Sequence, residues 1–366
     1  LYDWFVTFRK EGFTEWNSSP YLPIDTLGFG SLYAFAQDPA MRELGREGMD
    51  FAYYLLAVHS QQGIFASSSG RTYIKEQFGN WSNCPSGLSW IGYGYGVPGH
   101  AGKGITSYCL SDYEPPKEFA QWFSIPRGKE MICQTTQGND GYVDLYTYKT
   151  ADYMMTSAND FHPGEPGHQE NPFQLTFNAV AQLWVTHPGE RALFGAARPS
   201  YWAGNGTLPK VNQYKAFAGL IYDIAPEHPV DFTHLYLPSM EFDRCEVEGK
   251  WAFVQLGSAY AAVYCSNGMR MQDFGSNKDR ECIAEGRRCI WLVRAAQADE
   301  FAAFEDFKAA MRGAALDADA EGRRYRFVDP VYGELRCQWG ETLYVNDAPM
   351  QYSGFDNYGK LTMQEK

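Results

Sequence analysis

The chain has 366 residues, of which 45% are hydrophobic, so it can bury one large or two smaller cores, and bulk disorder is excluded. Its formal net charge of −13 and the lack of any Lys/Arg run longer than two exclude an ordinary nucleic-acid binder. The best apolar run, from Ala52 to Val58, is too short to span a bilayer, so no membrane partner is expected.

Residues 1–110 are predicted to form a helical part. Apolar side chains recur at helical spacing over residues 1–8, 24–35 and 41–58. Pro23 suits the first turn of the second helix, and Asp38-Pro39 ends it, so the second and third helices form a hairpin. Because the sequence opens inside a helix, we expect that it is a fragment or that upstream sequence has been removed.

Two polar loops flank this hairpin. The first runs from Asn17 to Tyr21, and the second from Ser69 to Tyr73. A glycine-rich segment, Trp90 to Gly104, follows and is irregular by composition. It either lines a cleft or links the two parts of the chain.

Residues 111–366 carry β patterns. Three pairs of short apolar segments flank turn residues, around Asn139-Asp140-Gly141, Gly257-Ser258 and Gly286-Arg287, which predicts hairpins. A helix is expected near residues 301–311, and strands resume at 325–345. The fold class is therefore α+β, with the helical part followed by a large antiparallel β-sandwich.

The eight cysteines include no C-x-x-C pair, so a thiolate zinc site of ordinary spacing is not expected. Several lie in apolar strand patterns, such as Cys265 and Cys289. Buried free thiols favour a reducing, cytoplasmic compartment.

Four loop clusters could carry chemistry, since no strict catalytic motif is present. Asn17 to Tyr21 could equally satisfy a helix N-terminus, and Arg71 beside Tyr73 suits a carboxylate clamp next to a proton donor, or a surface ion pair. The loop of residues 159–170 contains His162 and His168 among acidic residues, which fits a catalytic or metal-binding role, or a simple turn. His187 and His234, at two strand ends, are expected to be structural.

The order of these parts resembles the heparinase II/III-like polysaccharide lyases. An Asn/Tyr loop in a helical hairpin precedes a sandwich with a His-bearing loop, and Tyr142–Tyr153 is similar to the opening strands of that family's sandwich. The resemblance implies an (α/α) toroid joined to an antiparallel sandwich, with the active site between them. Only about two hairpins precede the sandwich, so the remaining toroid helices would lie upstream or on an additional chain.

The resemblance also implies a function and a set of site residues. It indicates cleavage of a uronic-acid-containing polysaccharide by β-elimination, with a toroid Asn, Tyr and Arg and a sandwich His as catalytic groups. The matching candidates here are Asn17, Tyr21, Arg71, Tyr73 and His162 or His168. The histidine loop is expected to face the helical part, within reach of Tyr21 or Arg71. No cofactor is required, and a structural zinc or calcium ion is left open.

The high aromatic content, 16% of residues, fits either large cores or sugar stacking. The predicted stacking residues are Trp16, Tyr93, Tyr95 and Trp202. A glycoside hydrolase on the same scaffold is the second hypothesis, and it would draw two carboxylates from Asp160, Glu165, Glu170 and Asp243. A third is a non-catalytic subunit for glycan binding or assembly.

Overall fold

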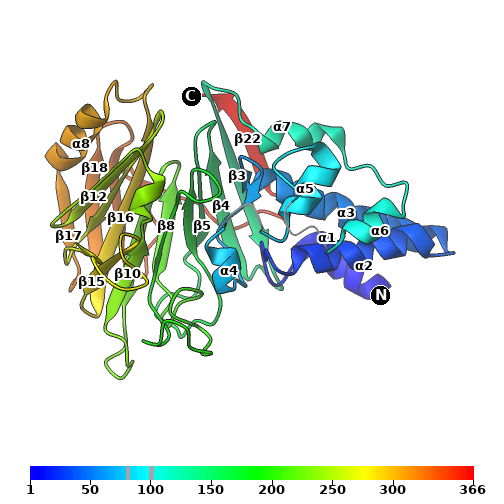
Figure 1. Cartoon of the computed structure of the whole chain (residues 1–366), viewed down its shortest axis with the longest axis horizontal. Helices are drawn as coiled ribbons and strands as arrows, with labels where there is room; N and C mark the ends of the chain where they lie inside the picture. The colour runs from blue at the N-terminus through cyan, green and yellow to red at the C-terminus, as the bar shows by residue number, and fades with distance from the viewer. Residues whose placement is uncertain (80–82, 99–102) are drawn as a thin grey trace.

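The computed structural model describes residues 1–79, 83–98 and 103–366. The helices of the first third of the chain gather at one end of the molecule and antiparallel sheets, with one later helix beside them, at the other, so the chain is an α+β protein (Figure 1). The helical structure extends through α7 (Ala120–Phe123), and the first strand of the large sheet, β3 (Lys129–Gln137), begins directly after it.

The expected helices at the start of the chain are present. They are α1 (Tyr2–Glu11), α2 (Leu22–Phe35) and α3 (Pro39–Val58), and the Asp38 carboxylate caps α3 by accepting from the Ala40 amide at 2.9 Å. Shorter elements follow: β1 (Ser60–Gln61), β2 (Ile64–Phe65), α4 (Ile74–Gln77), α5 (Ser86–Tyr93), α6 (Ile105–Cys109) and η1 (Lys117–Phe119). The glycine-rich segment is thus helical as far as Tyr93, and its residues 99–102 lie outside the described part.

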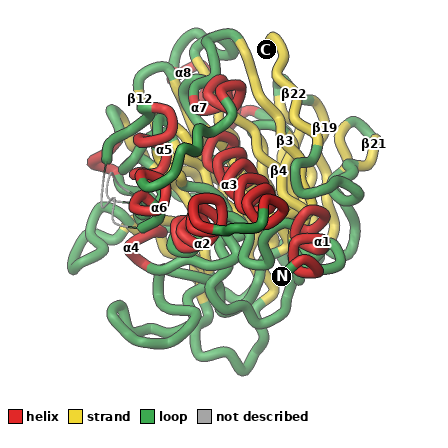
Figure 2. The backbone as a smooth tube through the Cα atoms, turned by 90° about the vertical axis from the view of Figure 1, so that its right-hand side faces the viewer, coloured by secondary structure: helices red, strands yellow, loops and turns green. Residues whose placement is uncertain are grey.

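Helices α2 and α3 pack unusually closely. A Cβ atom on Gly48 would lie 2.5 Å from the Phe29 ring, and one on Gly45 would lie 2.6 Å from the Tyr33 backbone nitrogen. Only glycine permits that approach, because any larger residue would push the two helices apart. Residues 51–58 of α3 are fully buried, and Figure 2 shows this helix crossing in front of β3 and β4.

A nine-stranded antiparallel sheet faces the helices. Its order is β14-β15-β10-β7-β6-β5-β4-β3-β22. Its remaining strands are β4 (Val143–Lys149), β5 (Met154–Asn159), β6 (Phe173–Thr176), β7 (Gln182–Thr186), β10 (Phe232–Tyr236), β14 (Arg270–Met271), β15 (Glu281–Glu285) and β22 (Lys360–Glu365). The predicted β3–β4 hairpin around residues 139–141 is confirmed.

Two further antiparallel sheets share one apolar core with the large sheet. The six-stranded sheet contains β8 (Lys210–Tyr214), β9 (Phe217–Asp223), β11 (Arg244–Glu248), β12 (Trp251–Leu256), β13 (Ala259–Cys265) and β16 (Arg288–Gln297). The five-stranded sheet contains β17 (Leu316–Asp319), β18 (Arg324–Asp329), β19 (Gly333–Gln338), β20 (Tyr344–Val345) and β21 (Ala348–Pro349). The short helix η2 (Ser239–Glu241) follows β10, and the expected helix α8 (Phe304–Gly313) packs Phe307 against Tyr260 of β13.

One predicted hairpin is wrong. β15 and β16 flank Gly286-Arg287 as expected, but β15 pairs with β10 and β14, whereas β16 pairs with β13 and β9. The connection therefore crosses between two sheets. The hairpin of β12 and β13 around Gly257-Ser258 is confirmed.

Buried polar groups join the helices to the large sheet. The Lys149 ammonium of β4 donates to the carbonyls of Ala57, Ser60 and Trp122, which lie at the end of α3, in β1 and in α7. Burial lowers the pKa of Lys149 to about 7 and that of the neighbouring His59 to about 3. The helices and the sheet are therefore joined by specific hydrogen bonds as well as by apolar packing.

The end of the chain returns to the helices. β22 pairs with β3 at the edge of the large sheet, and Leu361 and Met363 pack against the helical core. The Asn357 amide also donates to the Phe8 carbonyl of α1. Over the described residues, no helix has the length and apolar character needed to cross a membrane.

Candidate active site

A cleft of about 540 Å³ lies between the start of α4 and the loop that joins β7 to β8. Two segments far apart in the sequence form its walls. The described lining residues are Tyr73, Ile74, Lys75, Gln169, Gly195, Ala196, Ala197, Arg198, Ser200 and Ala203. Tyr73 is the one catalytic candidate from the sequence that lines this cleft directly, and Gln169 lies inside the predicted histidine loop.

Tyr73 is hydrogen-bonded to a second tyrosine. Its hydroxyl oxygen lies 3.4 Å from that of Tyr21, which stands at the start of α2, while Tyr73 immediately precedes α4. The hydrogen bond with Tyr21 lowers the pKa of Tyr73, and the Arg71 and Arg198 guanidiniums lower it further. The same hydrogen bond raises the pKa of Tyr21. The pair is thus divided into a more acidic and a less acidic phenol.

Two arginines flank the tyrosine pair. Arg71 lies over the Tyr21 ring at 5.3 Å, and Arg198 lies over the Tyr73 ring at 5.5 Å. Arg71 is held by Glu15, with 2.7 Å from Nε to Oε1, and by Gln169 at 3.2 Å. In the described part of the chain, the exposed Arg198 has no side-chain hydrogen bond or ion pair, so its guanidinium can bind an anion.

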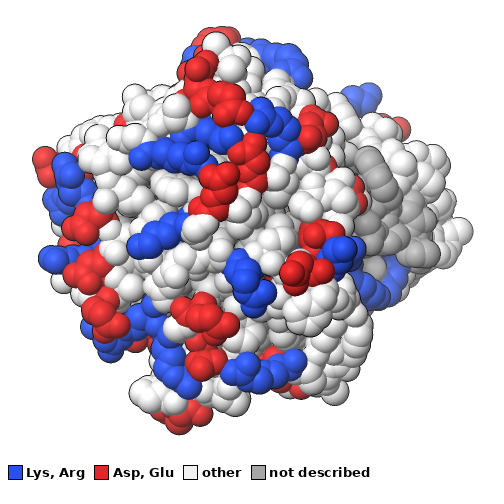
Figure 3. All heavy atoms as spheres, turned by 60° about the vertical axis from the view of Figure 1, so that its left-hand side comes forward, with Lys and Arg blue, Asp and Glu red and all other residues white. Residues whose placement is uncertain are grey.

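The cleft differs in charge from the rest of the surface. Its described lining contains Lys75 and Arg198 and no acidic side chain, although the chain as a whole is acidic. On the outer face of the sheets, Lys and Arg alternate with Asp and Glu (Figure 3), as in the pair of Arg326 with Glu334. An anionic ligand is therefore attracted locally at the cleft.

The wall that contains Arg198 rests on a buried hydrogen-bond network. The Tyr201 hydroxyl donates to the Glu281 carboxylate at 2.5 Å, and that carboxylate also contacts His234 Nδ1 at 2.6 Å and Asn277 Nδ2 at 2.8 Å. Burial alone would raise the pKa of Glu281, but the hydrogen bonds from His234, Tyr201 and Asn277 hold it below its usual value. His234 is therefore a structural residue in this network, as expected.

Asn17 lies beside the cleft but is enclosed. Its backbone φ of 47° is left-handed, and its side chain is 2% exposed. Neither amide atom has a hydrogen-bond partner among residues 1–79, 83–98 and 103–366. It lines a small internal cavity together with Glu76 and Gln174, so in this conformation it does not face the cleft.

The structure does not bring the two predicted histidines to the tyrosine pair. His162 packs on Phe161 and Tyr142, with its Nδ1 3.6 Å from Glu165. His168 is exposed. Between the described residues, neither imidazole forms a hydrogen bond with Tyr21 or Arg71. The loop does reach Arg71, but through Gln169, the residue that follows His168, whose side-chain oxygen accepts from the Arg71 guanidinium at 3.2 Å.

Of the four predicted stacking residues, the two tryptophans are buried packing residues, whereas Tyr93 and Tyr95 are partly exposed. Trp16 is fully buried against Phe161, and Trp202 is 2% exposed and stacks on His234 with ring centroids 4.2 Å apart. Tyr95 stacks on Phe123, and the Tyr93 hydroxyl donates to the Pro116 carbonyl at 2.8 Å. A sugar needs an open ring face, which protein atoms cover in both tryptophans.

Arg198 was missed from the sequence. It stands three residues before the aromatic pair Tyr201-Trp202, a spacing close to that of Arg71, which stands two residues before Tyr73. That local similarity was the only signal, because the partner wall lies more than 120 residues earlier in the chain.

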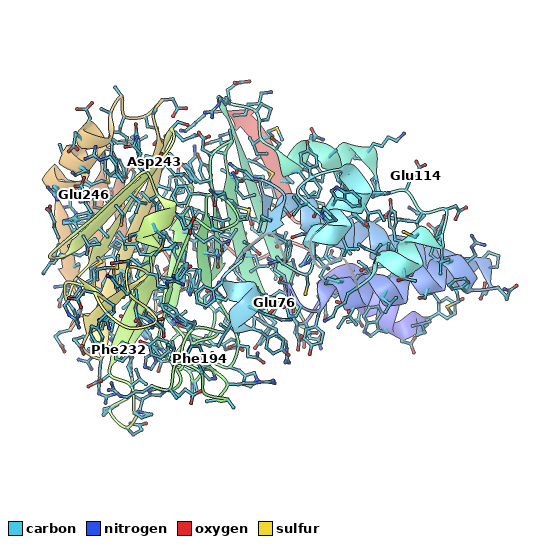
Figure 4. The ribbon with its side chains drawn as sticks, viewed as in Figure 1. Glu76, Glu114, Phe194, Phe232, Asp243 and Glu246 are labelled. Atoms are coloured by element: carbon cyan, nitrogen blue, oxygen red, sulfur yellow. The ribbon has the colours of Figure 1, made fainter. Side chains whose placement is uncertain are left out.

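The carboxylates proposed for a hydrolase do not line this cleft. Asp160 is paired with Lys210 and also accepts from Asn212, Glu170 accepts from the His168 amide, and Asp243 accepts from the Gly257 amide. Figure 4 shows Asp243 over the sheets at upper left, well separated from Glu76 near the middle of the molecule. Over residues 1–79, 83–98 and 103–366, no three His, Cys, Asp or Glu side chains gather in a metal-binding group.

Comparisons with family models, with curated proteins and with solved structures return no match for this chain.

Proposed function

We propose that the chain is a carbohydrate-active enzyme, a polysaccharide lyase that cleaves a uronic-acid-containing glycan by β-elimination. The observation that supports this best is the tyrosine pair at a basic cleft. Tyr73 has a lowered pKa, Tyr21 a raised one, and Arg198, which has no ion-pair partner among the described residues, lies over the Tyr73 ring. A base, an acid and a carboxylate-binding group are the three parts that this reaction needs.

The chemistry assigns one role to each group. Arg198 binds the uronate carboxylate and stabilises the negative charge that develops on it. The Tyr73 phenolate removes the C5 proton, the C–H electron pair forms the C4–C5 double bond, and the C4–O bond breaks. Tyr21 protonates the leaving oxygen. The proton then passes from Tyr73 to Tyr21 across the 3.4 Å hydrogen bond, which restores both residues.

A hydrolase is less well supported by this geometry. Hydrolysis of a glycosidic bond needs two carboxyl groups on opposite sides of the sugar. Near the tyrosines, the Glu15 carboxylate is engaged by Arg71, and Asp25 is largely buried in α2 with its pKa raised to about 7 by that burial and by Glu15. Neither carboxylate is among the described residues that line the cleft. A non-catalytic glycan-binding subunit would need the basic cleft but not two phenols with opposite pKa shifts.

We infer further that the helical part is the end of an (α/α) toroid. Its support is the α2–α3 hairpin together with the outer side of α2, where Ile24, Leu27 and Phe35 are exposed. A helix that is apolar on every side is normally covered by other helices, as the further hairpins of a toroid would do.

The test is the Tyr73→Phe variant, assayed on polygalacturonate, alginate and hyaluronan by the ultraviolet absorbance of the unsaturated product. The rate should fall about 100-fold or more, because general acid–base catalysis contributes about that much. Tyr358→Phe is the matched control, since Tyr358 is a half-exposed tyrosine beside α3, and it should keep full activity. Reducing ends without absorbance would favour the hydrolase, and full activity in Tyr73→Phe would exclude Tyr73 as the base.

A further inference from the structure

The loop that forms one wall of the cleft carries the most exposed large apolar side chain of the described residues. Phe194 is 86% exposed, and Figure 4 shows it below α4, among the loops at one end of the large sheet. The four residues that follow it, Gly195 to Arg198, all line the cleft. An aromatic ring therefore stands in solvent next to the group that is proposed to bind the uronate.

This loop is closed by its own hydrogen bonds. The Glu190 carboxylate accepts from the Ala197 amide at 2.9 Å, and the Gly195 amide donates to the Ala192 carbonyl at 3.1 Å. Phe194 thus lies in a short closed segment rather than in an open, extended strand of chain. Its position relative to Arg198 is limited, because four residues span at most about 14 Å.

Both ends of the loop also contact the large sheet, one through an exposed ion pair and the other through a buried hydrogen bond. On one side, Arg191 forms an ion pair with Asp231 at 2.6 Å, and its guanidinium lies over the Phe232 ring at 5.5 Å. On the other side, Tyr201 is held by the buried Glu281 carboxylate. A ring presented on a fixed loop loses little conformational freedom when a ligand covers it.

The other large aromatic residues near this wall are inside the protein. Trp184, Trp202 and Tyr236 form one buried cluster that Phe78 joins at its edge. Phe194 is outside that cluster, so its exposure does not follow from core packing. A phenyl ring left in water is unfavourable, and covering it with an apolar surface is favourable.

We propose that Phe194 forms an additional sugar-binding subsite, where its ring stacks on the apolar face of a pyranose next to the unit held at Arg198. The class of ligand rests on the proposed function. The geometry of the loop itself is independent of the reaction, and it would serve any glycan chain that extends past Arg198. Phe194 then determines how strongly the enzyme prefers longer chains.

The experiment compares Phe194→Ala with wild type on a disaccharide and on a tetrasaccharide of the best substrate among polygalacturonate, alginate and hyaluronan. KM for the tetrasaccharide should rise about tenfold, while kcat changes less than twofold and the disaccharide is little affected. Phe194→Trp should restore KM, because the larger ring still stacks. Phe35→Ala is the control, since Phe35 is a 58% exposed phenylalanine of α2, away from the cleft.

An unchanged tetrasaccharide KM in Phe194→Ala, or an equal rise in Phe35→Ala, would overturn the subsite. Calorimetric titration of the same three glycans separates this from the proposed function. If no unsaturated product forms but wild type binds a glycan and Phe194→Ala binds it about tenfold more weakly, the lyase fails and the subsite holds. If wild type binds none of the three, both fail.

Discussion

The two walls of the cleft carry similar side chains on different supports. The wall from the helical part holds Arg71 and Tyr73 through an ion pair with Glu15, whose partners are 24% and 38% exposed. The wall from the sheet holds Arg198 through Tyr201 and the buried carboxylate of Glu281. One support is open to water, and the other is enclosed.

The two supports differ in how much stability the protein loses when one of their residues is substituted. A solvated ion pair contributes little stability, because water replaces either partner at small cost. A buried carboxylate must be fully hydrogen-bonded, and removal of one partner leaves the others without compensation. The sheet wall is therefore expected to be fixed and intolerant of substitution, while the helical wall can adjust.

The largest expected effect is at Glu281. Glu281→Ala should lower the free energy of unfolding by about 3–5 kcal/mol, because it leaves His234 and Tyr201 buried without their acceptor. Urea unfolding followed by circular dichroism measures this loss. The matched control is Glu246→Ala, a partly exposed ion-pair residue at the far end of the molecule in Figure 4, which should lose less than about 1 kcal/mol. Equal losses in the two variants would remove the distinction between the walls.

The next largest effect is expected at His187, behind the sheet wall, where the free energy of unfolding should depend on pH. Burial lowers the pKa of His187 to about 3, and the His187 amide donates to Asn205 near the base of the loop. The unfolded imidazole titrates near 6.5, so between pH 6.5 and 3 the unfolded chain binds the extra proton. The stabilising contribution of neutral His187 is therefore complete above pH 6.5 and is lost as the pH falls.

Between pH 6.5 and 5, this loss should be about 2 kcal/mol for His187. Over the same interval, the free energy of unfolding of His187→Gln should fall by about 2 kcal/mol less than that of wild type. Urea midpoints at each pH, converted to free energies, measure the two decreases. His59, which is also buried with a pKa of about 3, contributes equally to both proteins and cancels in the comparison. His168→Gln, at an exposed histidine, serves as the control, and its free energy of unfolding should change with pH as that of wild type does. Parallel slopes for all three proteins would contradict the assignment.

The smallest effect is expected at the helical wall. Glu15→Gln should change the free energy of unfolding by less than about 1 kcal/mol, since the ion pair with Arg71 is half-exposed. Chemical unfolding at low and high salt measures this change. The difference in free energy of unfolding between wild type and Glu15→Gln should become smaller at high salt, because salt screens the ion pair. A loss as large as that of Glu281→Ala would mean that both walls are equally rigid.

Much of the local structure could be predicted from the sequence, but pairing between sheets could not. The periodic helices and the turns at residues 139–141 and 257–258 specify their elements locally. Gly286-Arg287 has the same kind of signal, yet it connects two sheets. Both β15 and β16 are largely buried, and the choice of partner depends on strands far away in the sequence, such as β10 and β9.

The candidate site was predictable to a similar extent. Arg71 and Tyr73 were found because they are adjacent to one another in one polar loop. Arg198 was not, because its partner Tyr73 lies on another wall. The prediction that two tryptophans stack on sugar is wrong for a different reason, since Trp16 and Trp202 lie inside the protein. Aromatic content alone does not indicate whether a ring is buried or exposed.

The return of the chain end to the helices has a consequence for biosynthesis. Leu361 and Met363 of β22 complete the helical core, and Asn357 bonds to α1, so contacts span almost the whole sequence. A ribosome releases the first helices long before these residues emerge. Until then, the apolar side of α3 lacks its covering strand, and the nascent helices are exposed to aggregation and to chaperones. Such long-range closure also slows folding, because the chain must bring distant segments together before their contacts stabilise it.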